Sequence, residues 1–326
     1  MSSFDRFLNK AFPQQSRRRL WASFAYTAVT RPHRLHRRFN RENFFLRRHF
    51  ARMTFLCNVC GNAGTPIYDM TDKQSAADYD YVLQRETLRC LRCDSTMRHR
   101  TIASALLEEI ATRTGRSAAT IEDLASVEDG ELKILDTDTF SPISSRLSQV
   151  RGYVRSKFLP NRPFGVELEP EVFNIDLQRI DFPSERFDII LTSDVMEHVR
   201  DDSRAHQEIW RCLRGSGIYI FTVPFRRNML YTKRLVDVST NRDIFLCPPH
   251  LHGDPLTSGV LAYRIYGQQL IAELQALGFV VEYRPTTSVK HAIFDGDIFL
   301  ARKPVGKVPP ETSEKEAKLR PAGFTE

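Results

Sequence analysis

Alternating apolar and polar runs predict an α/β sheet in the second half of the chain. Residues 132–138, 186–194 and 217–225 have the length and composition of buried strands. Segments at 204–217 and 266–279 instead repeat their apolar residues at the spacing of a helix. Because strands and helices alternate, this order predicts a Rossmann-like, mostly parallel sheet of seven strands.

Shorter segments supply the other strands of the predicted sheet. Residues 163–170 are the expected second strand, and residues 171–177 form a short third element. Residues 280–285 and 297–304 predict an antiparallel hairpin that closes the sheet. We expect the helix at 204–217 to end at Gly215 as its C-cap.

Composition divides the chain into four parts. Residues 1–52 form a basic arm with a helical pattern, and residues 53–100 carry paired cysteines. Residues 101–305 contain a first helix followed by the α/β pattern. Residues 306–326 are polar, contain prolines and have few large apolar residues, so we expect a disordered tail.

The positive charge of the protein is concentrated in the arm. Residues 1–56 hold twelve arginines and one lysine against two acids, a net of +11, which leaves −4 for the rest of a chain whose total is +7. Arginines interleaved with phenylalanines suit a helix that packs on the next domain, lies on an anionic membrane surface or contacts nucleic acid. An Arg-rich segment with so few acids is also compatible with an organellar transit peptide.

The sequence gives no membrane or export signal. It lacks a run of about 18 apolar residues, and its first residues do not have the pattern of a signal peptide. We therefore expect a cytoplasmic protein, with peripheral attachment to a membrane through its arm as an alternative.

Four of the six cysteines occur as two C-x2-C pairs separated by 29 residues. They are Cys57, Cys60, Cys90 and Cys93. Each pair can bend round one side of an ion, so together they predict a four-thiolate Zn²⁺ site with no open position, which is a structural role. Two disulfides or four free thiols are the alternatives, and disulfides are disfavoured because nothing indicates secretion.

A group of polar residues follows the apolar strand at 186–194. Ser193, Asp194, Glu197 and His198 come together at its carboxyl end. In an open α/β sheet, ligands bind outside the carboxyl ends of the strands. The alternative is that these side chains only cap the next helix or face water.

The run FPSERFDIILTSDVMEHV, residues 182–199, resembles the fourth strand of class I S-adenosylmethionine-dependent methyltransferases. Residues 208–225, EIWRCLRGSGIYIFTVPF, are similar to the helix, turn and fifth strand that follow in this family, with Arg-Gly-Ser-Gly where a proline and paired glycines are usual. Residues 263–279 resemble its late helix. A narrower likeness lies in CLRCDSTMRHR, residues 90–100, which resembles bacterial members that carry an N-terminal zinc module.

The resemblance implies a set of roles in cofactor binding. Glu167 occupies the position of the carboxylate that binds the ribose hydroxyls. Asp176 and Leu177 match the residues that contact adenine. The remaining positions, which border the methionine part and the sulfonium, are Asp136, Asp138, Ser193 and Asp194.

The turn after the first strand departs from the family pattern. The segment ILDTDTFSPISSRL, residues 134–147, contains no glycine, and Phe140 and Pro142 stand where glycines are usual. S-adenosylmethionine has no pyrophosphate, so the strict dinucleotide loop is less necessary. Whether Phe140 fills the crevice and disables the site is open at this point.

The implied activity is methyl transfer from S-adenosylmethionine. His198 is the expected general base, because its ordinary pKa lies near neutrality. His252, Arg264 and Tyr266 are expected to contact the substrate. We favour a small-molecule or glycan acceptor. An RNA methyltransferase that uses the arm and the zinc module, and a non-catalytic methyltransferase-like binding protein, are the alternatives.

Overall fold

The computed structural model describes residues 54–64, 66–68, 85–86, 88–124, 132–252 and 259–306. The predicted arm at 1–52 lies outside the described residues, as does the predicted tail from residue 307 onward. Among the residues that are described, no helix is long and apolar enough to span a bilayer.

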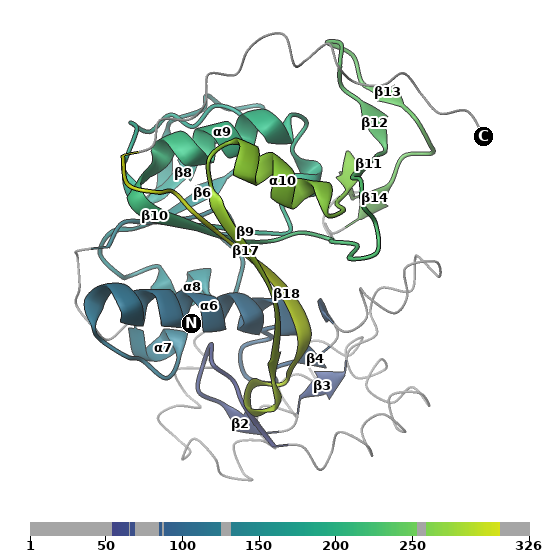
Figure 1. The fold of residues 1–326 in the computed structure, drawn as a ribbon. Coiled ribbons are helices and arrows are strands. Elements are labelled where there is room, and N and C mark those ends of the chain that lie inside the picture. Colours follow the sequence, from purple (N-terminus) through teal and green to yellow (C-terminus); the bar gives the residue numbers. More distant parts are fainter. Residues whose placement is uncertain are drawn as a thin grey trace.

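An eight-stranded sheet forms the centre of the molecule, in the order β17-β18-β10-β9-β5-β6-β8-β7 (Figure 1). The strands are β5 Ile134–Asp136, β6 Tyr153–Lys157, β7 Glu167–Glu169, β8 Val172–Asn174, β9 Phe187–Ser193, β10 Leu213–Thr222, β17 Val280–Ser288 and β18 Ile293–Arg302. β10, β9, β5, β6 and β8 are parallel, while β7, β18 and β17 pair antiparallel. The α/β class and the closing hairpin are confirmed, with one more strand than the seven expected.

The second parallel strand is β6, and the expectation that residues 163–170 form it is wrong. Tyr153 and Val154 of β6 are buried beside β5, whereas β7 is a short strand at the outer edge of the sheet. Residues 161–167 are all exposed. The apolar side chains at Phe164 and Val166 imitate a buried strand in the sequence, but they lie on the surface.

Helices cover both faces of the sheet (Figure 1). α6 Met97–Thr114, α7 Ile121–Leu124 and α8 Ser144–Leu147 lie on one face, and α9 Asp202–Cys212 and α10 Gln269–Ala276 on the other. Alternate residues of β9 enter the two cores, because side chains of a strand point to opposite faces. Ile189 and Leu191 pack in the core with α6, and Ile190 packs in the core with α9.

α9 runs into β10 without a glycine cap. The helix ends at Cys212, and Leu213, with φ −72° and ψ 137°, is already extended. Gly215 lies within β10, so its predicted role as the C-cap is wrong. β10 therefore begins at Leu213, before Gly215, and not after it.

The cysteine-bearing segment forms a small module beneath α6. Its strands are β1 Phe55–Leu56, β2 Ala63–Gly64, β3 Ile67–Tyr68 and β4 Leu88–Arg89. Arg100 is fully buried, and its guanidinium donates to the carbonyls of Leu88 and Ser95 in the module and of His291 and Ala292 in the β17–β18 turn, over 2.6–2.9 Å. This turn contains the 3-10 helix η2 Val289–His291. The Arg100 side chain thus connects the module to the β17–β18 turn.

A cap of short strand pairs lies between β10 and α10. We use this name for the described residues 223–252 and 259–268. Its strands are β11 Lys233–Arg234, β12 Val236–Asp237, β13 Ile244–Phe245, β14 Leu251–His252, β15 Val260–Leu261 and β16 Arg264–Ile265. Tyr263 N donates to Glu197 O over 2.8 Å, which places the cap against the 3-10 helix η1 Met196–His198.

Candidate active site and metal centre

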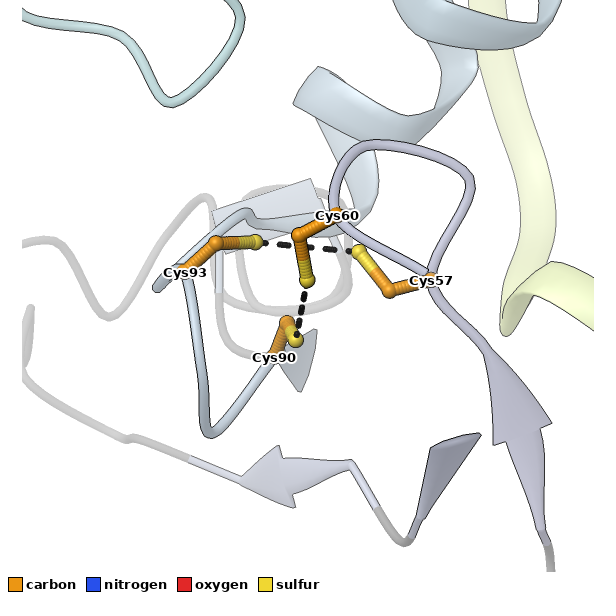
Figure 2. Close-up of side chains that lie close together, drawn as sticks. All are labelled: Cys57, Cys60, Cys90 and Cys93. Atoms are coloured by element: carbon orange, nitrogen blue, oxygen red, sulfur yellow. Dashed lines mark hydrogen bonds between the residues drawn. The ribbon is translucent and has the colours of Figure 1, made fainter. Parts of the chain in front are cut away.

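The four paired cysteines converge as the sequence predicts. Their Sγ atoms all lie within 4.8 Å of one another. Figure 2 shows the four side chains pointing toward one another. Cys57 and Cys93 are 3.7 Å apart at sulfur, and so are Cys60 and Cys90. All six cysteines of the chain are free of disulfides, so the disulfide alternative is excluded.

The sulfur spacing fits a tetrahedral metal. Zn–S bonds of about 2.3 Å place the four sulfurs of a regular tetrahedron about 3.8 Å apart. Each pair sits on the same type of turn, in which the residue after the second cysteine has a left-handed φ: +70° at Gly61 and +62° at Asp94. Gly61 N and Asp94 N each donate 2.8 Å back to the carbonyl of the first cysteine of the pair. The two turns therefore present thiols in a geometry that suits Zn²⁺.

The turn after β5 is held by acidic side chains in place of glycines. Asp136 Oδ1 accepts from Asp138 N at 2.9 Å, and Asp138 Oδ1 accepts from Phe140 N at 3.0 Å. The hydroxyl of Tyr153 donates to the other oxygen of Asp136. Burial, followed by the charge of Asp138, raises the pKa of Asp136 to about 7.

The backbone of this turn does not depend on glycine. None of residues 137–142 has a left-handed φ, so the backbone has no need of glycine there. The Phe140 side chain is 87% exposed and therefore does not fill a crevice. The possibility that Phe140 blocks the site is excluded in this conformation.

Arg98 connects the cysteine module to the carboxyl edge of the sheet. Its guanidinium donates to Glu86 Oε1 at 2.6 Å and to the hydroxyl of Ser193, and it lies 3.4 Å from Asp194 Oδ2. Arg85 donates to Asp194 Oδ1 at 2.9 Å. Two arginines from the N-terminal module thus reach residues that follow β9.

Asp194 combines a left-handed backbone conformation with a lowered side-chain pKa. Its φ of +51° is left-handed, a backbone strain that recurs at functional sites. Burial alone would raise its pKa, but the charges of Arg85 and Arg98 outweigh burial and lower the pKa to about 2. Asp194 is therefore a carboxylate throughout the physiological range.

Glu197 is a buried carboxyl group without a hydrogen-bond partner among the described residues. It is 1% exposed, and neither Oε1 nor Oε2 has a partner. Burial, followed by the charge of Asp194, raises its pKa to about 8. A buried polar group of this kind calls for a ligand or another compensating group.

The raised pKa of Glu197 makes stability depend on pH. The folded state keeps a proton on Glu197 between about pH 4.5 and pH 8 while the unfolded state has lost it, so the contribution of Glu197 to stability falls as pH rises through this window. Glu197→Gln should therefore gain stability relative to wild type from pH 5.5 to pH 8.5, by about 3 kcal/mol. Urea denaturation at both pH values measures this difference.

The exposed Glu169 offers the matched control for this experiment. Its pKa is lowered, chiefly by its hydrogen bond with Lys157, so it stays ionised in both states throughout the same pH range. Glu169→Gln should show a constant difference from wild type. A constant difference for Glu197→Gln as well would contradict a raised pKa at Glu197.

His198 lies beside Glu197 on η1. Its Nδ1 is 2.9 Å from the carbonyl of Leu261, which can only accept, so Nδ1 carries the proton in the neutral ring. Nε2 lies 3.7 Å from Glu197 Oε1. Burial lowers the pKa of His198 below its ordinary value, so the ring is neutral at pH 7. The imidazole is in the protonation state that a general base requires.

The predicted adenosine residues are only partly where the sequence placed them. Asp176 follows β8 at the carboxyl edge, where its carboxylate accepts from Gln178 N at 2.9 Å. Leu177 is buried in the core. Glu167 is exposed on the edge strand β7 and accepts from Glu171 N, so its predicted place at the end of the second parallel strand is wrong.

Lys157 stands where Glu167 was expected. It ends β6, and its Nζ lies 2.7 Å from Glu169 Oε1 and 5.9 Å from the centre of the Phe140 ring. Lys157 was not among the expected site residues, because residues 163–170 were expected to form the second strand. The signal that could have identified β6 was the apolar pair Tyr153 and Val154, followed by charged residues at every second position.

Two of the predicted substrate contacts are core residues. Arg264 is 1% exposed, and its guanidinium donates to the carbonyls of Met196, Val199 and Arg200 over 2.6–2.9 Å. Tyr266 is fully buried and donates to Asp202 Oδ2 at 3.0 Å. Both hold η1 and the start of α9 in place, so the expectation of direct substrate contact is wrong. His252 belongs to β14, and its side chain lies outside the described part.

The main residues that the sequence analysis overlooked at this edge are Arg85 and Glu86. They have no motif and stand more than 100 residues from Asp194 in the sequence. Arg98 belongs to the run at residues 90–100, and its guanidinium contacts Glu86 and Asp194. In that run His99 caps α6, with Nδ1 3.1 Å from Thr96 N.

Comparison with known families gives one match. The sequence model described as a methyltransferase domain matches residues 153–221, which run from β6 into β10. No curated protein matches the chain.

Solved structures give weaker likenesses. An S-adenosylmethionine-dependent methyltransferase from Mesorhizobium loti is 15% identical, with 56% of this chain and 95% of that chain covered and a TM-score of 0.36. The 1,6-didemethyltoxoflavin-N1-methyltransferase of Burkholderia thailandensis, solved with bound 1,6-didemethyltoxoflavin and S-adenosylhomocysteine, is 18% identical, with 64% of this chain and 78% of that chain covered and a TM-score of 0.36. At TM-scores this low, the likenesses add nothing to the description of the site.

The family match covers most of the parallel part of the central sheet. It covers the second to fifth parallel strands, whose carboxyl ends lead into Lys157, Asp176 and Asp194. The strand order reverses beside β5, where open α/β sheets bind their ligands. Residues 153–221 of the α/β part therefore match the family model of a methyltransferase domain.

Proposed function

We propose that this protein transfers a methyl group from S-adenosylmethionine to a small-molecule or glycan-type acceptor. The observation that carries the proposal is the gathering of Asp138, Asp194 and Glu197 at the carboxyl ends of β5 and β9. This is the point at which chain connections leave β5 in opposite directions, with β6 on one side and β9 on the other.

The residues at this edge fit the cofactor. The carboxylate of Asp138 is complementary to its ammonium and sulfonium charges, and the protonated, partnerless carboxyl of Glu197 offers a hydrogen-bond donor and an acceptor. Arg98 and Arg85 suit its carboxylate, and Asp176 suits the adenine amino group. When bound, S-adenosylmethionine supplies a methyl group made electrophilic by the adjacent sulfonium.

His198 acts as the general base in this proposal. Its Nδ1–H is fixed by the carbonyl of Leu261, which leaves Nε2 to take the proton from an acceptor hydroxyl or amine. Glu197 Oε1 lies 3.7 Å from Nε2, so the carboxyl group is next to the position of the transferred proton. The main contribution of the protein is alignment of the acceptor with the methyl group.

Charge and surface favour a small acceptor over RNA. The chain beyond residue 56 carries a net charge of −4, which does not suit a phosphate backbone. The cap beside η1 exposes apolar side chains, among them Tyr231, Phe245 and Leu251. Such a surface suits an acceptor with apolar parts better than it suits a polyanion.

We assign the four-thiolate cluster to a structural Zn²⁺. All four ligand positions are taken by Cys57, Cys60, Cys90 and Cys93, so no coordination position is left for a substrate. The ion would fix the module that carries Arg85 and Arg98. Zinc thus supports the cofactor edge without taking part in the reaction.

The proposed function is tested by binding and then by labelling. Full-length protein should bind S-adenosylhomocysteine saturably in calorimetry. With methyl-labelled cofactor, label should appear in the metabolite or glycan fraction of a cell extract. Absence of binding at millimolar cofactor would exclude the enzyme, and label found only in RNA would exclude the small acceptor.

Replacing His198 tests its role as the base. His198→Gln should lower the rate of methyl transfer by about 10²–10⁴-fold, while S-adenosylhomocysteine affinity stays the same. His250→Gln, on the neighbouring cap, serves as the control and should retain the wild-type rate. Equal rates for wild type and His198→Gln would remove His198 from the mechanism.

A further inference from the structure

A cavity of about 260 Å³ lies at the opposite edge of the sheet from the methyl-transfer site. Its lining includes Lys133, Arg151, Glu171 and Arg186. Lys133, Glu171 and Arg186 immediately precede β5, β8 and β9, and Arg151 comes just before β6. Because these four strands are neighbours and parallel, the residues before them meet at the amino-terminal edge.

The lining of this cavity is strongly cationic. Lys133, Arg151, Arg186 and Arg214 contribute four positive charges, against the single carboxylate of Glu171. Arg214 pairs with Asp188 at 2.9 Å. Within the described part of the chain, no carboxylate pairs with Lys133, Arg151 or Arg186. Three cations therefore share one cavity without a counter-charge of their own.

Two of these cations are held in position by their surroundings. The guanidinium of Arg186 lies over the Phe182 ring, 4.3 Å from its centre. The Lys133 side chain passes over Gly152, where an added Cβ would lie 3.3 Å from Lys133 Cδ and 2.5 Å from Leu132 O. Gly152 also has a φ of +86°, so glycine is required there. Two of the four cations therefore have defined positions at the cavity, and Gly152 is needed for its shape.

The geometry points to a second binding site at this edge, for a small molecule that carries a phosphate group. Like charges that share a cavity repel one another, and an anion between them removes that repulsion. A phosphate monoester carries nearly two negative charges at pH 7 and matches the forked donors of arginine. The volume is just below the range of about 300–1,000 Å³ usual for ligand pockets, which suits a small molecule and not a nucleic-acid strand.

Equilibrium dialysis of full-length protein with labelled inorganic phosphate tests this site. The buffer contains saturating S-adenosylhomocysteine, so that binding at the cofactor edge does not contribute. Wild type should bind phosphate saturably, and the double variant Lys133→Met with Arg186→Met should bind at least about tenfold more weakly. Methionine retains an unbranched apolar stem and removes the charged donor group.

The control is a double variant with the same loss of charge elsewhere, Arg242→Met with Lys290→Met, both at exposed positions. It should bind phosphate as wild type does, since any contribution of the basic arm is equal in both variants. Equal weakening in the two double variants, or no saturable binding by wild type, would overturn the site. If the cavity double variant does not fold, the exposed Arg151 provides the substitute test through Arg151→Ala, with the same expected weakening.

Discussion

Cys90→Ser should remove the metal from the protein and unfold the N-terminal module. Wild type is expected to contain about one Zn²⁺ per chain, and the variant well under half of that. Four-thiolate zinc sites have apparent binding free energies of about 10–16 kcal/mol, and much of this energy stabilises the fold around the ion. The loss should reach beyond the module, because α6 begins at Met97, four residues after Cys93.

The measurements are zinc content by atomic absorption, thermal unfolding and affinity for S-adenosylhomocysteine. All three should fall in Cys90→Ser, because the turn that precedes Arg98 is no longer fixed. Cys247→Ser is the matched control, since Cys247 is half-buried in the cap and away from the other thiols. A protein that keeps its full zinc content after loss of Cys90 would refute the four-thiolate site.

Arg98→Met should destabilise the protein and weaken cofactor binding together. The change leaves Glu86 and Asp194 without the guanidinium that neutralises them. Breaking a buried ion pair typically costs about 3–5 kcal/mol, and we expect about 2–4 kcal/mol here because Asp194 keeps Arg85. Urea denaturation and calorimetry with S-adenosylhomocysteine measure the two effects.

Arg284→Met offers a comparison with the same change in charge. Arg284 pairs with Glu108 and Glu282 on the surface, where such pairs contribute about 1 kcal/mol or less. Its loss should leave cofactor affinity unchanged. If the two variants were equally destabilised and bound the cofactor equally well, Arg98 would be an ordinary surface arginine.

Local patterns in the sequence were sufficient for most of the fold. β9 and β10 are long apolar strands buried on both faces, and such runs have few alternative structures. The cysteine pairs were also predictable, because metal-binding geometry requires a short spacing within each pair. These features depend on residues close together in the chain.

Other features of the site depended on distant residues and could not be predicted. The pairing of Arg85 with Asp194 joins positions 109 apart, and no local pattern specifies it. Arg264 and Tyr266 are polar residues that the sequence suggests are on the surface. In the structure both are buried, because Arg264 donates to a carbonyl of η1 and Tyr266 donates to the carboxylate of Asp202. β6 and β7 were confused because burial in the sheet, and not apolar content alone, distinguishes an inner strand from an edge strand.

The hydrogen-bond acceptors of Arg100 are synthesised at two widely separated times. Its partners Leu88 and Ser95 leave the ribosome before it, but His291 and Ala292 follow about 190 residues later. At about 5–20 residues per second, roughly 10–40 s separate the two ends of this junction. For that interval a guanidinium that is fully buried in the finished protein has only half of its acceptors. The newly made chain therefore cannot complete this junction until β18, which follows the last two acceptors, begins to be made.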